Sequence, residues 1–316
     1  MKGRILPATR QAILEAARII RSGGLVAFPT ETVYGLGANA LDSGAVDKIF
    51  EAKGRPRDNP LILHVASVEH AARCAVIDDR AEALMRRFWP GPLTLVLRSR
   101  DIVPEDTRGG LETVALRMPQ NRIALTLIEE SELPIAAPSA NRSGRPSPTS
   151  ARVVAEDLGG HVDLILDGGE CNIGLESTVV DATGESIVIL RPGGVSREML
   201  AVETPLAEAH GLAHRSPGTR YRHYAPNLPL LLWDGKDRSF FDRLGDEKWC
   251  YMGLQKPPGK PHRAALFEST EAYAKELFAR LREFEGSEAS VIVAELPQKA
   301  GIGEAVRNRL FRAAGG

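Results

Sequence analysis

Three cations stand close together in the stretch KGRPRDNPL, which begins at Lys53. Lys53, Arg55 and Arg57 share this stretch with one glycine and two prolines, and the prolines lower the entropy cost of holding the cations in place. Arginine offers a planar fork to phosphate or carboxylate, and lysine offers a point charge. A helix end would explain Lys53 and Gly54 alone. Because it does not explain Arg55, Arg57 and Asn59, the loop predicts a triphosphate or carboxylate site.

A second polar stretch, PSANRSG at residues 138–144, follows a short apolar run. Ordinary hydroxyl-rich turns have this composition. Ser139, Asn141 and Ser143 nevertheless stand at the end of an expected strand, where α/β sheets bind ligands. Small hydroxyls and backbone N–H groups can surround an anion there. The glycine-containing loop PTETVYGLG, residues 29–37, also leaves an expected strand and permits close approach of its backbone.

Several common catalytic patterns are absent from the sequence. GLGANA and GIGEAV lack the third glycine of a dinucleotide fingerprint, and no GxxxxGK[ST] or HExxH occurs. Taken alone, His64 in LILHV is an ordinary strand residue and Arg117 in VALRMP a partly exposed strand cation. STVVD and RPG likewise read as turns at the ends of strands. What recurs is cations and hydroxyls at strand ends, which favours substrate positioning and charge neutralisation, as in nucleotidyl transfer.

The bulk composition narrows the class of protein. A chain of 316 residues indicates two domains, at roughly 100–200 residues per domain. The formal net charge of −1 gives no general electrostatic reason to bind nucleic acid or a membrane. Cys74, Cys171 and Cys250 lie far apart without zinc-site spacing, a pattern typical of a reducing compartment. Since no signal core or bilayer-length apolar run occurs either, we expect a cytoplasmic protein without a membrane partner.

Hydrophobic periodicity predicts the elements that must position these residues. Helices are expected at residues 9–22, 43–53, 81–88, 121–131, 153–158, 270–284 and 303–314. Strands are expected at residues 25–28, 61–65, 93–97, 113–117, 134–137, 163–166, 178–180, 187–190, 228–233 and 290–296. Strands and helices interleave, which predicts an α/β fold with a twisted mixed sheet. The expected division is a catalytic domain at 1–204, a linker at 205–228 and a small α/β domain at 229–316.

Six motifs of this chain occur together, in the same order, in one known family. They are PTETVYGLG, the KxR of KGRPRDNPL, FWPGPLTLVL, PSANRSG, STVVD and RPGG. Over about residues 15 to 195 the sequence resembles the YrdC-domain threonylcarbamoyl-adenylate synthases. SPGTRYRHYAP resembles the linker of the long form of this family, and ELPQKAGIGEAVRNRLFRAA resembles the end of its C-terminal domain. The resemblance implies a YrdC-like mixed-sheet domain followed by a smaller Rossmann-like α/β domain.

The resemblance also implies an activity. Such enzymes combine L-threonine, bicarbonate and ATP, with Mg2+ carried on the ATP, into threonylcarbamoyl-AMP and pyrophosphate. A separate threonylcarbamoyl transferase complex then modifies tRNAs reading ANN codons, so tRNA would be contacted only indirectly or weakly. The chemistry requires the N-carboxylate of threonine to meet the α-phosphate. Two unit charges about 4 Å apart repel by roughly 4 kcal/mol at an effective dielectric constant near 20, and fixed cations lower this barrier.

Roles for individual residues follow from the same resemblance. The catalytic residues would be Lys53, Arg55, Ser139 and Asn141. Threonine would be bound by Thr32, His64, Arg117, Ala137 and Ser177. The nucleotide would be bound by Arg55, Asn59, Thr113, Ser139, Ser147, Arg191 and Tyr224. For the linker residue that closes over the nucleotide, Tyr221 and His223 are alternatives to Tyr224.

Two other functions compete with this one. In a ribosome-associated or RNA-binding module the cations would hold a phosphate backbone, but no basic stripe is interleaved with aromatic residues. A hydrogenase-maturation factor with a similar domain would carry zinc-finger cysteines, and this chain has three scattered cysteines. For the synthase, we expect the C-terminal domain to hold the linker as a lid over the site.

Overall fold

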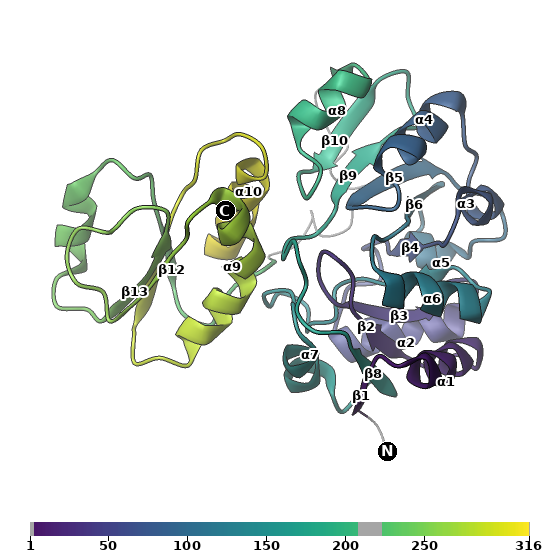
Figure 1. Cartoon of the computed structure of the whole chain (residues 1–316), viewed down its shortest axis with the longest axis horizontal. Helices are drawn as coiled ribbons and strands as arrows, with labels where there is room; N and C mark the ends of the chain where they lie inside the picture. The colour runs from purple at the N-terminus through teal and green to yellow at the C-terminus, as the bar shows by residue number, and fades with distance from the viewer. Residues whose placement is uncertain (1–2, 208–222, 316) are drawn as a thin grey trace.

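Two α/β domains, each built on its own sheet, make up the molecule (Figure 1). The computed structural model describes residues 3–207 and 223–315. We call the part built on the eleven-stranded sheet the first domain and the part built on the four-stranded sheet the second domain. Helices α9 and α10 of the second domain lie on the side of its sheet that faces the first domain (Figure 1). The second domain therefore meets the first through its helices.

The first domain is a twisted mixed sheet with the strand order β1-β8-β2-β3-β7-β4-β6-β5-β9-β10-β11. Its strands are β1 (Arg4–Pro7), β2 (Val26–Phe28), β3 (Gly35–Asn39), β4 (Ile62–His64), β5 (Leu93–Arg98), β6 (Thr113–Arg117), β7 (Ile135–Ala136), β8 (Leu164–Asp167), β9 (Thr178–Asp181), β10 (Ile187–Arg191) and β11 (Leu206–Ala207). Its helices are α1 (Arg10–Arg21), α2 (Ser43–Lys53), α3 (Val68–Cys74), α4 (Asp79–Phe88), α5 (Glu105–Arg108), α6 (Arg122–Ser131), α7 (Ala151–Leu158) and α8 (Arg197–Glu203). Parallel and antiparallel pairs alternate irregularly, so strand ends from distant parts of the sequence reach the same edge.

Local sequence explains the helix that carries the first cation. Asp42 caps the N-terminus of α2 by accepting from the backbone N–H groups of Gly44 and Ala45. Gly54 ends the helix with φ 60°, in the left-handed region that a glycine adopts at low cost. The expected helix over residues 43–53 is confirmed. Lys53 is the last residue of α2, so the Lys53 side chain leaves the helix where the loop KGRPRDNPL begins.

The second domain has four parallel strands in the order β12-β15-β13-β14. Its elements are β12 (Leu230–Trp233), the 3-10 helix η2 (Arg238–Leu244), β13 (Trp249–Gly253), β14 (Arg263–Leu266), α9 (Thr270–Glu285), β15 (Val291–Glu295) and α10 (Gly303–Ala314). Three buried residues that precede these elements in the sequence, Val33, Leu175 and Tyr224, pack into its hydrophobic cluster. Two of them belong to loops of the first domain, so the domain interface has an apolar centre.

Most expected elements are confirmed, and the differences have physical reasons. PTETVYGLG is not a loop throughout, because its GLG portion begins β3. A Cβ at Gly37 would lie 2.7 Å from the Phe28 ring, so this strand needs glycine where it crosses β2. Helix α3 and strands β1, β13 and β14 were not expected. Strand β11 lies inside the expected linker, and residues 208–222 of that linker lie outside the described residues.

Two negative findings apply to the described residues. None of their helices combines the length and the apolar character needed to cross a bilayer. They also contain no group of three or more His, Cys, Asp or Glu side chains that could hold a metal ion.

Candidate active site

Most of the predicted site residues line one cavity of the first domain. Residues that precede the second domain close one side of this cavity. His64 and Arg117 end the parallel strands β4 and β6, so they reach the same edge of the sheet. Arg191 ends β10, and Ser177 stands just before β9. The predicted residues that line the cavity are Lys53, Arg55, His64, Arg117, Ala137, Ser139, Asn141, Ser177, Arg191 and Tyr224.

Four predicted residues lie outside the cavity lining. Thr32 accepts a hydrogen bond from Arg117 at 2.9 Å, and Ser147 donates one to Glu176 at 2.5 Å, so both stand directly behind lining residues. The backbone carbonyl of Asn59 accepts from Arg55 Nε. Thr113 begins β6, four residues before Arg117 and about 13 Å away along the strand. The structure does not bring Thr113 to the cavity, and its nucleotide contact stays a prediction.

Lys53 joins the two predicted catalytic motifs. Its Nζ donates hydrogen bonds to the backbone carbonyls of Ser139 and Asn141, so the loop KGRPRDNPL and the loop PSANRSG meet at one wall. Lys53 is only 4% exposed and forms no ion pair with the described residues. Burial, and then the charge of Arg55, hold the pKa of Lys53 well below its usual value. The amine is therefore oriented by neutral carbonyl groups.

The other two cations of KGRPRDNPL lie in different surroundings. Arg55 lines the cavity and closes its own loop, because its guanidinium donates to the carbonyls of Asn59 and Pro60. Arg57 instead forms an ion pair with Asp47 of α2 and does not line the cavity. The expectation of a preset cationic loop therefore holds for Lys53 and Arg55 but not for Arg57.

A buried ion pair between Arg117, which lines the cavity, and Glu31 stands beside the cavity. Arg117 NH2 lies 2.7 Å from Glu31, its NH1 donates to Thr32, and its Nε donates to the carbonyl of Gly91 at 3.3 Å. The interpretation of Arg117 as a partly exposed strand cation is wrong, because the residue is 4% exposed. The Glu31 carboxylate was not predicted, although it lies within PTETVYGLG. Arg117 is thus fixed on three sides, and its charge is compensated.

His64 is the neighbour of Arg117 in the paired strands β4 and β6. Its ring packs edge-on against Phe28, with the ring centroids 6.0 Å apart. Burial, and then the positive charge of Arg117, lower the pKa of His64 to about 3. His64 is therefore neutral at neutral pH, and one ring nitrogen has no hydrogen-bond partner among the described residues.

Ser177 and Arg191 form a third group. Arg191 donates to the carbonyl and the hydroxyl of Ser177, and the Ser177 hydroxyl also bonds the Thr94 hydroxyl at 2.7 Å. Beside them, Glu176 lines the cavity and accepts from Arg309 Nε at 2.7 Å. Burial would raise the pKa of Glu176, but Arg309 and Arg191 hold this pKa below its usual range. The Glu176 carboxylate is therefore charged.

Tyr224 closes the cavity from the linker side. The residue is buried, and its ring stacks on Phe278 of α9 with the centroids 5.2 Å apart. Its φ of 64° lies in the left-handed region, which is an outlier for a bulky residue and costs of order 1–3 kcal/mol. His223 also lines the cavity, whereas Tyr221, the other alternative, lies outside the described residues.

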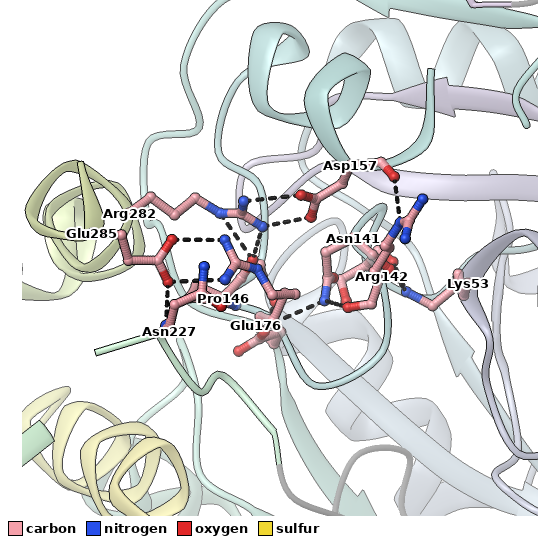
Figure 2. A network of polar contacts seen from close by, with 12 residues as sticks. Lys53, Asn141, Arg142, Pro146, Asp157, Glu176, Asn227, Arg282 and Glu285 are labelled. Atoms are coloured by element: carbon pink, nitrogen blue, oxygen red, sulfur yellow. Dashed lines mark hydrogen bonds and ion pairs between the residues drawn. The ribbon is translucent and has the colours of Figure 1, made fainter. Parts of the chain in front are cut away.

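The second domain also contacts the chain just after the loop PSANRSG. Arg282 of α9 donates to the Asp157 carboxylate and to the carbonyl of Pro146, and Glu285 pairs with Arg145 (Figure 2). The Asn141 side chain, in turn, donates to the carbonyls of Arg142 and Arg145 (Figure 2). Helix α9 therefore contacts the chain just after this loop, and Lys53 contacts the loop itself.

Fold and site together define a two-domain α/β protein with a buried cationic cavity suited to anionic ligands. The family described as "Telomere recombination" matches residues 18–193, and the family described as "Threonylcarbamoyl-AMP synthase, C-terminal domain" matches residues 193–315. The threonylcarbamoyl-AMP synthase of Pyrococcus abyssi is 48% identical over 95% of this chain and 93% of its own length. The enzyme of the same name from Bacillus subtilis is 44% identical over 96% of this chain and 93% of its own length.

A solved structure agrees with these sequence matches. The crystal structure of P. abyssi Sua5 complexed with L-threonine superposes with a TM-score of 0.89 at 47% identity, covering 96% of this chain and 94% of that chain. This chain belongs to the threonylcarbamoyl-AMP synthase family, in its two-domain form. The resemblance inferred from the six motifs and the α/β fold class are confirmed, and family membership disfavours both competing functions.

Proposed function

We propose that this protein is an L-threonylcarbamoyladenylate synthase, which converts L-threonine, bicarbonate and ATP into threonylcarbamoyl-AMP and pyrophosphate. One structural observation supports the proposal in addition to family membership. Lys53 is buried, lines the cavity and binds the backbone of both Ser139 and Asn141. The two motifs that the sequence predicts for the anionic centre therefore form one wall with an oriented amine.

Two groups of cavity residues suit the two substrates. We call the group around Arg117 the threonine end and the group around Lys53 the phosphate end. Arg117 offers a fixed guanidinium to the threonine carboxylate, and the hydroxyls of Thr32 and Ser177 stand close to Arg117 and Arg191. A site that hydrogen-bonds the threonine hydroxyl rejects analogues without it far better than an apolar pocket rejects a change of size. The neutral His64 and the backbone at Ala137 complete this end of the cavity. We assign threonine to this end.

The nucleotide belongs, in this proposal, to the wall formed by Lys53, Arg55 and Ser139, with Arg191 and Tyr224 beside it. The neutral amine of threonine first attacks the carbon of bicarbonate, which then loses water, or the carbon of CO2, with release of one amine proton to solvent; either route gives an N-carboxylate. One of its oxygens then attacks the α-phosphorus, and the bond from that phosphorus to the bridging oxygen breaks, so pyrophosphate leaves. Fixed cations offset the repulsion between the carboxylate and the phosphates. Mg2+ enters this proposal as part of the ATP substrate.

The remaining parts of the proposal concern context. We assign catalysis to residues 1–204, closure to the linker 205–228, and support of that linker to residues 229–316. The downstream partner would be a threonylcarbamoyl transferase complex, with tRNA contacted only indirectly or weakly. Cys74, Cys171 and Cys250 are buried and unpaired, which suits the reducing cytoplasm that we propose as the compartment.

Pyrophosphate release tests the proposed function. The full-length protein is incubated with MgATP while L-threonine and bicarbonate are omitted in turn, and L-serine replaces L-threonine in a matched reaction. Release that requires both co-substrates, together with recovery of threonylcarbamoyl-AMP, supports the synthase. Absence of release under every condition, combined with tight and salt-sensitive RNA binding, would overturn it in favour of the RNA-binding module.

A further inference from the structure

Arg309, on helix α10, is the largest fully buried side chain of the described residues, with an exposed fraction of 0%. It belongs to the second domain, yet its contacts lie largely at the active site. Its Nε donates to the Glu176 carboxylate at 2.7 Å, and its NH1 donates to the carbonyl of Pro192 at 3.0 Å. Both acceptors belong to the first domain. A cation from the second domain thus reaches the wall of the cavity.

The partner of Arg309 connects it to the predicted substrate contacts. Glu176 lines the cavity, and its other carboxylate oxygen accepts from the Ser147 hydroxyl at 2.5 Å. Ser147 lies on the loop that also carries Ser139 and Asn141. The chain of contacts therefore runs from Arg309 through Glu176 to this loop. Without Arg309, the wall would keep a buried carboxylate beside a site for anions.

Arg309 also contacts the ring that closes the cavity. Its guanidinium carbon lies 5.3 Å from the centroid of the Tyr224 ring, within the range of a cation–π interaction. Phe278 of α9 stacks on the same ring. Two helices of the second domain thus hold Tyr224 in its left-handed backbone conformation.

We propose that Arg309 is a positioning residue of the active site, which neutralises the Glu176 carboxylate and holds the Tyr224 ring against the cavity. This proposal rests on the synthase activity proposed above. Its physical core is electrostatic: a carboxylate paired with a guanidinium repels an incoming phosphate or carbamate far less than an unpaired one in the same low-dielectric wall. The second domain would then supply charge compensation to the site as well as support for the linker.

The test changes the charges of Arg309 and Glu176 separately. If Arg309 made only a structural contact, removing the charge of Glu176 would not restore the KM values. Arg309→Met removes the ion-pair partner of Glu176 and leaves only the weaker influence of Arg191, so we expect the KM for ATP or threonine to rise about tenfold to hundredfold. Adding Glu176→Gln removes the offending charge, so the double variant is expected to recover most of that loss. Arg309→Lys keeps the charge and should lie between the wild type and Arg309→Met.

A matched control is available on the same helix. Arg307 donates to the carbonyl of Pro297, within the second domain, so Arg307→Met should leave the KM values unchanged. KM and kcat are measured by pyrophosphate release, and threonine binding is measured separately by calorimetry. Wild-type KM values in Arg309→Met would overturn the proposal, and so would a double variant as poor as Arg309→Met. If Arg309→Met does not fold, Arg309→Gln, which keeps a hydrogen-bond donor without the charge, is compared with Arg309→Gln/Glu176→Gln: recovery on adding Glu176→Gln supports the proposal, and no recovery overturns it.

The same experiments separate this inference from the proposed function. A wild-type protein that releases no pyrophosphate contradicts the synthase itself. A wild-type protein that releases pyrophosphate with both co-substrates, while Glu176→Gln fails to rescue the arginine variants, contradicts only the role of Arg309.

Discussion

Lys53 and Arg117 are cations of the same cavity, and each is 4% exposed. They differ in what holds them. Lys53 donates to two backbone carbonyls, whereas Arg117 pairs with the buried carboxylate of Glu31. A carbonyl orients a cation but leaves its charge uncompensated, while a carboxylate compensates that charge. The part of the cavity around Lys53, where we propose that the phosphates bind, therefore has a cation without a carboxylate partner, whereas the charge of Arg117, which we propose binds threonine, is largely compensated by Glu31.

This difference explains why one chain carries two kinds of buried cation. Burial and Arg55 lower the pKa of Lys53, and a highly charged triphosphate supplies the negative charge that favours the protonated amine. An amino acid is a zwitterion, and a fork held on three sides recognises its carboxylate by shape as well as by charge. Arg309 resembles Arg117 in this respect, because it too is buried against a carboxylate, Glu176. The two ends should respond differently to mutation.

The largest expected effect is on folding stability at Arg117. Arg117→Ala leaves Glu31 as a buried carboxylate, so the free energy of unfolding should fall by about 3–5 kcal/mol. Urea unfolding measures this loss, and adding Glu31→Gln to Arg117→Ala should recover part of it. The control is Arg87→Ala, whose pair with Glu203 is exposed and should be worth less than about 1 kcal/mol. Equal effects of Arg117→Ala and Arg87→Ala would remove the distinction drawn above.

Lys53 should show the opposite pattern, with activity lost and stability largely kept. Lys53→Ala removes an oriented positive charge from the anionic centre, so pyrophosphate release should fall about 100- to 1,000-fold, equivalent to about 2.7–4 kcal/mol. The free energy of unfolding should change by no more than about 1–2 kcal/mol, because removing a desolvated charge offsets the two lost hydrogen bonds.

A lysine on the same helix controls for this result. Lys48 is exposed and donates to the carbonyl of Gly23, away from the cavity, so Lys48→Ala should retain wild-type turnover. If Lys53→Ala destabilises the protein as strongly as Arg117→Ala does, the comparison between oriented and compensated cations fails.

The sequence predicted the phosphate end better than the threonine end. Lys53, Arg55, Ser139 and Asn141 lie in two short motifs, and helix signals at Asp42 and Gly54 placed the first of them correctly. A strand end followed by small polar residues is a local pattern, so a local analysis finds it. Arg117 stands inside a strand without any such signal, and its exposure was misjudged because burial depends on which strands pair.

The charge partners could not be predicted because they join distant parts of the chain. Arg309 and Glu176 are 133 residues apart in sequence, and no spacing rule connects them. Their pairing depends on how α10 of the second domain docks on the first domain, which is a tertiary property. Glu31 does lie within a motif, so an acidic residue beside Thr32, a predicted threonine contact, is a signal that the sequence offers for this position. The β3 strand was missed for a related reason, because glycines that permit close strand packing also occur in loops.

The smallest expected effect concerns His64, the neighbour of Arg117 in the paired strands β4 and β6. Its pKa is about 3 in the folded protein and about 6.5 when unfolded, so the unfolded chain binds more protons between these values. Stability should therefore fall as the pH drops from about 6.5 toward 3. Between pH 7.5 and 5.5 this single histidine should cost about 1 kcal/mol of unfolding free energy. His64→Asn should remove that part of the pH dependence.

The variant must be judged on the difference between the two pH values, because losing the ring contact with Phe28 lowers stability at both. Urea unfolding at pH 7.5 and 5.5 gives this difference for the wild type, for His64→Asn and for the exposed control His161→Asn. A pH difference in His64→Asn equal to that of the wild type would mean that the pKa of His64 does not change on folding, so that burial and the charge of Arg117 do not keep the ring neutral. A smaller pH difference in His64→Asn would mean that burial, with a further contribution from Arg117, keeps His64 neutral in the folded protein.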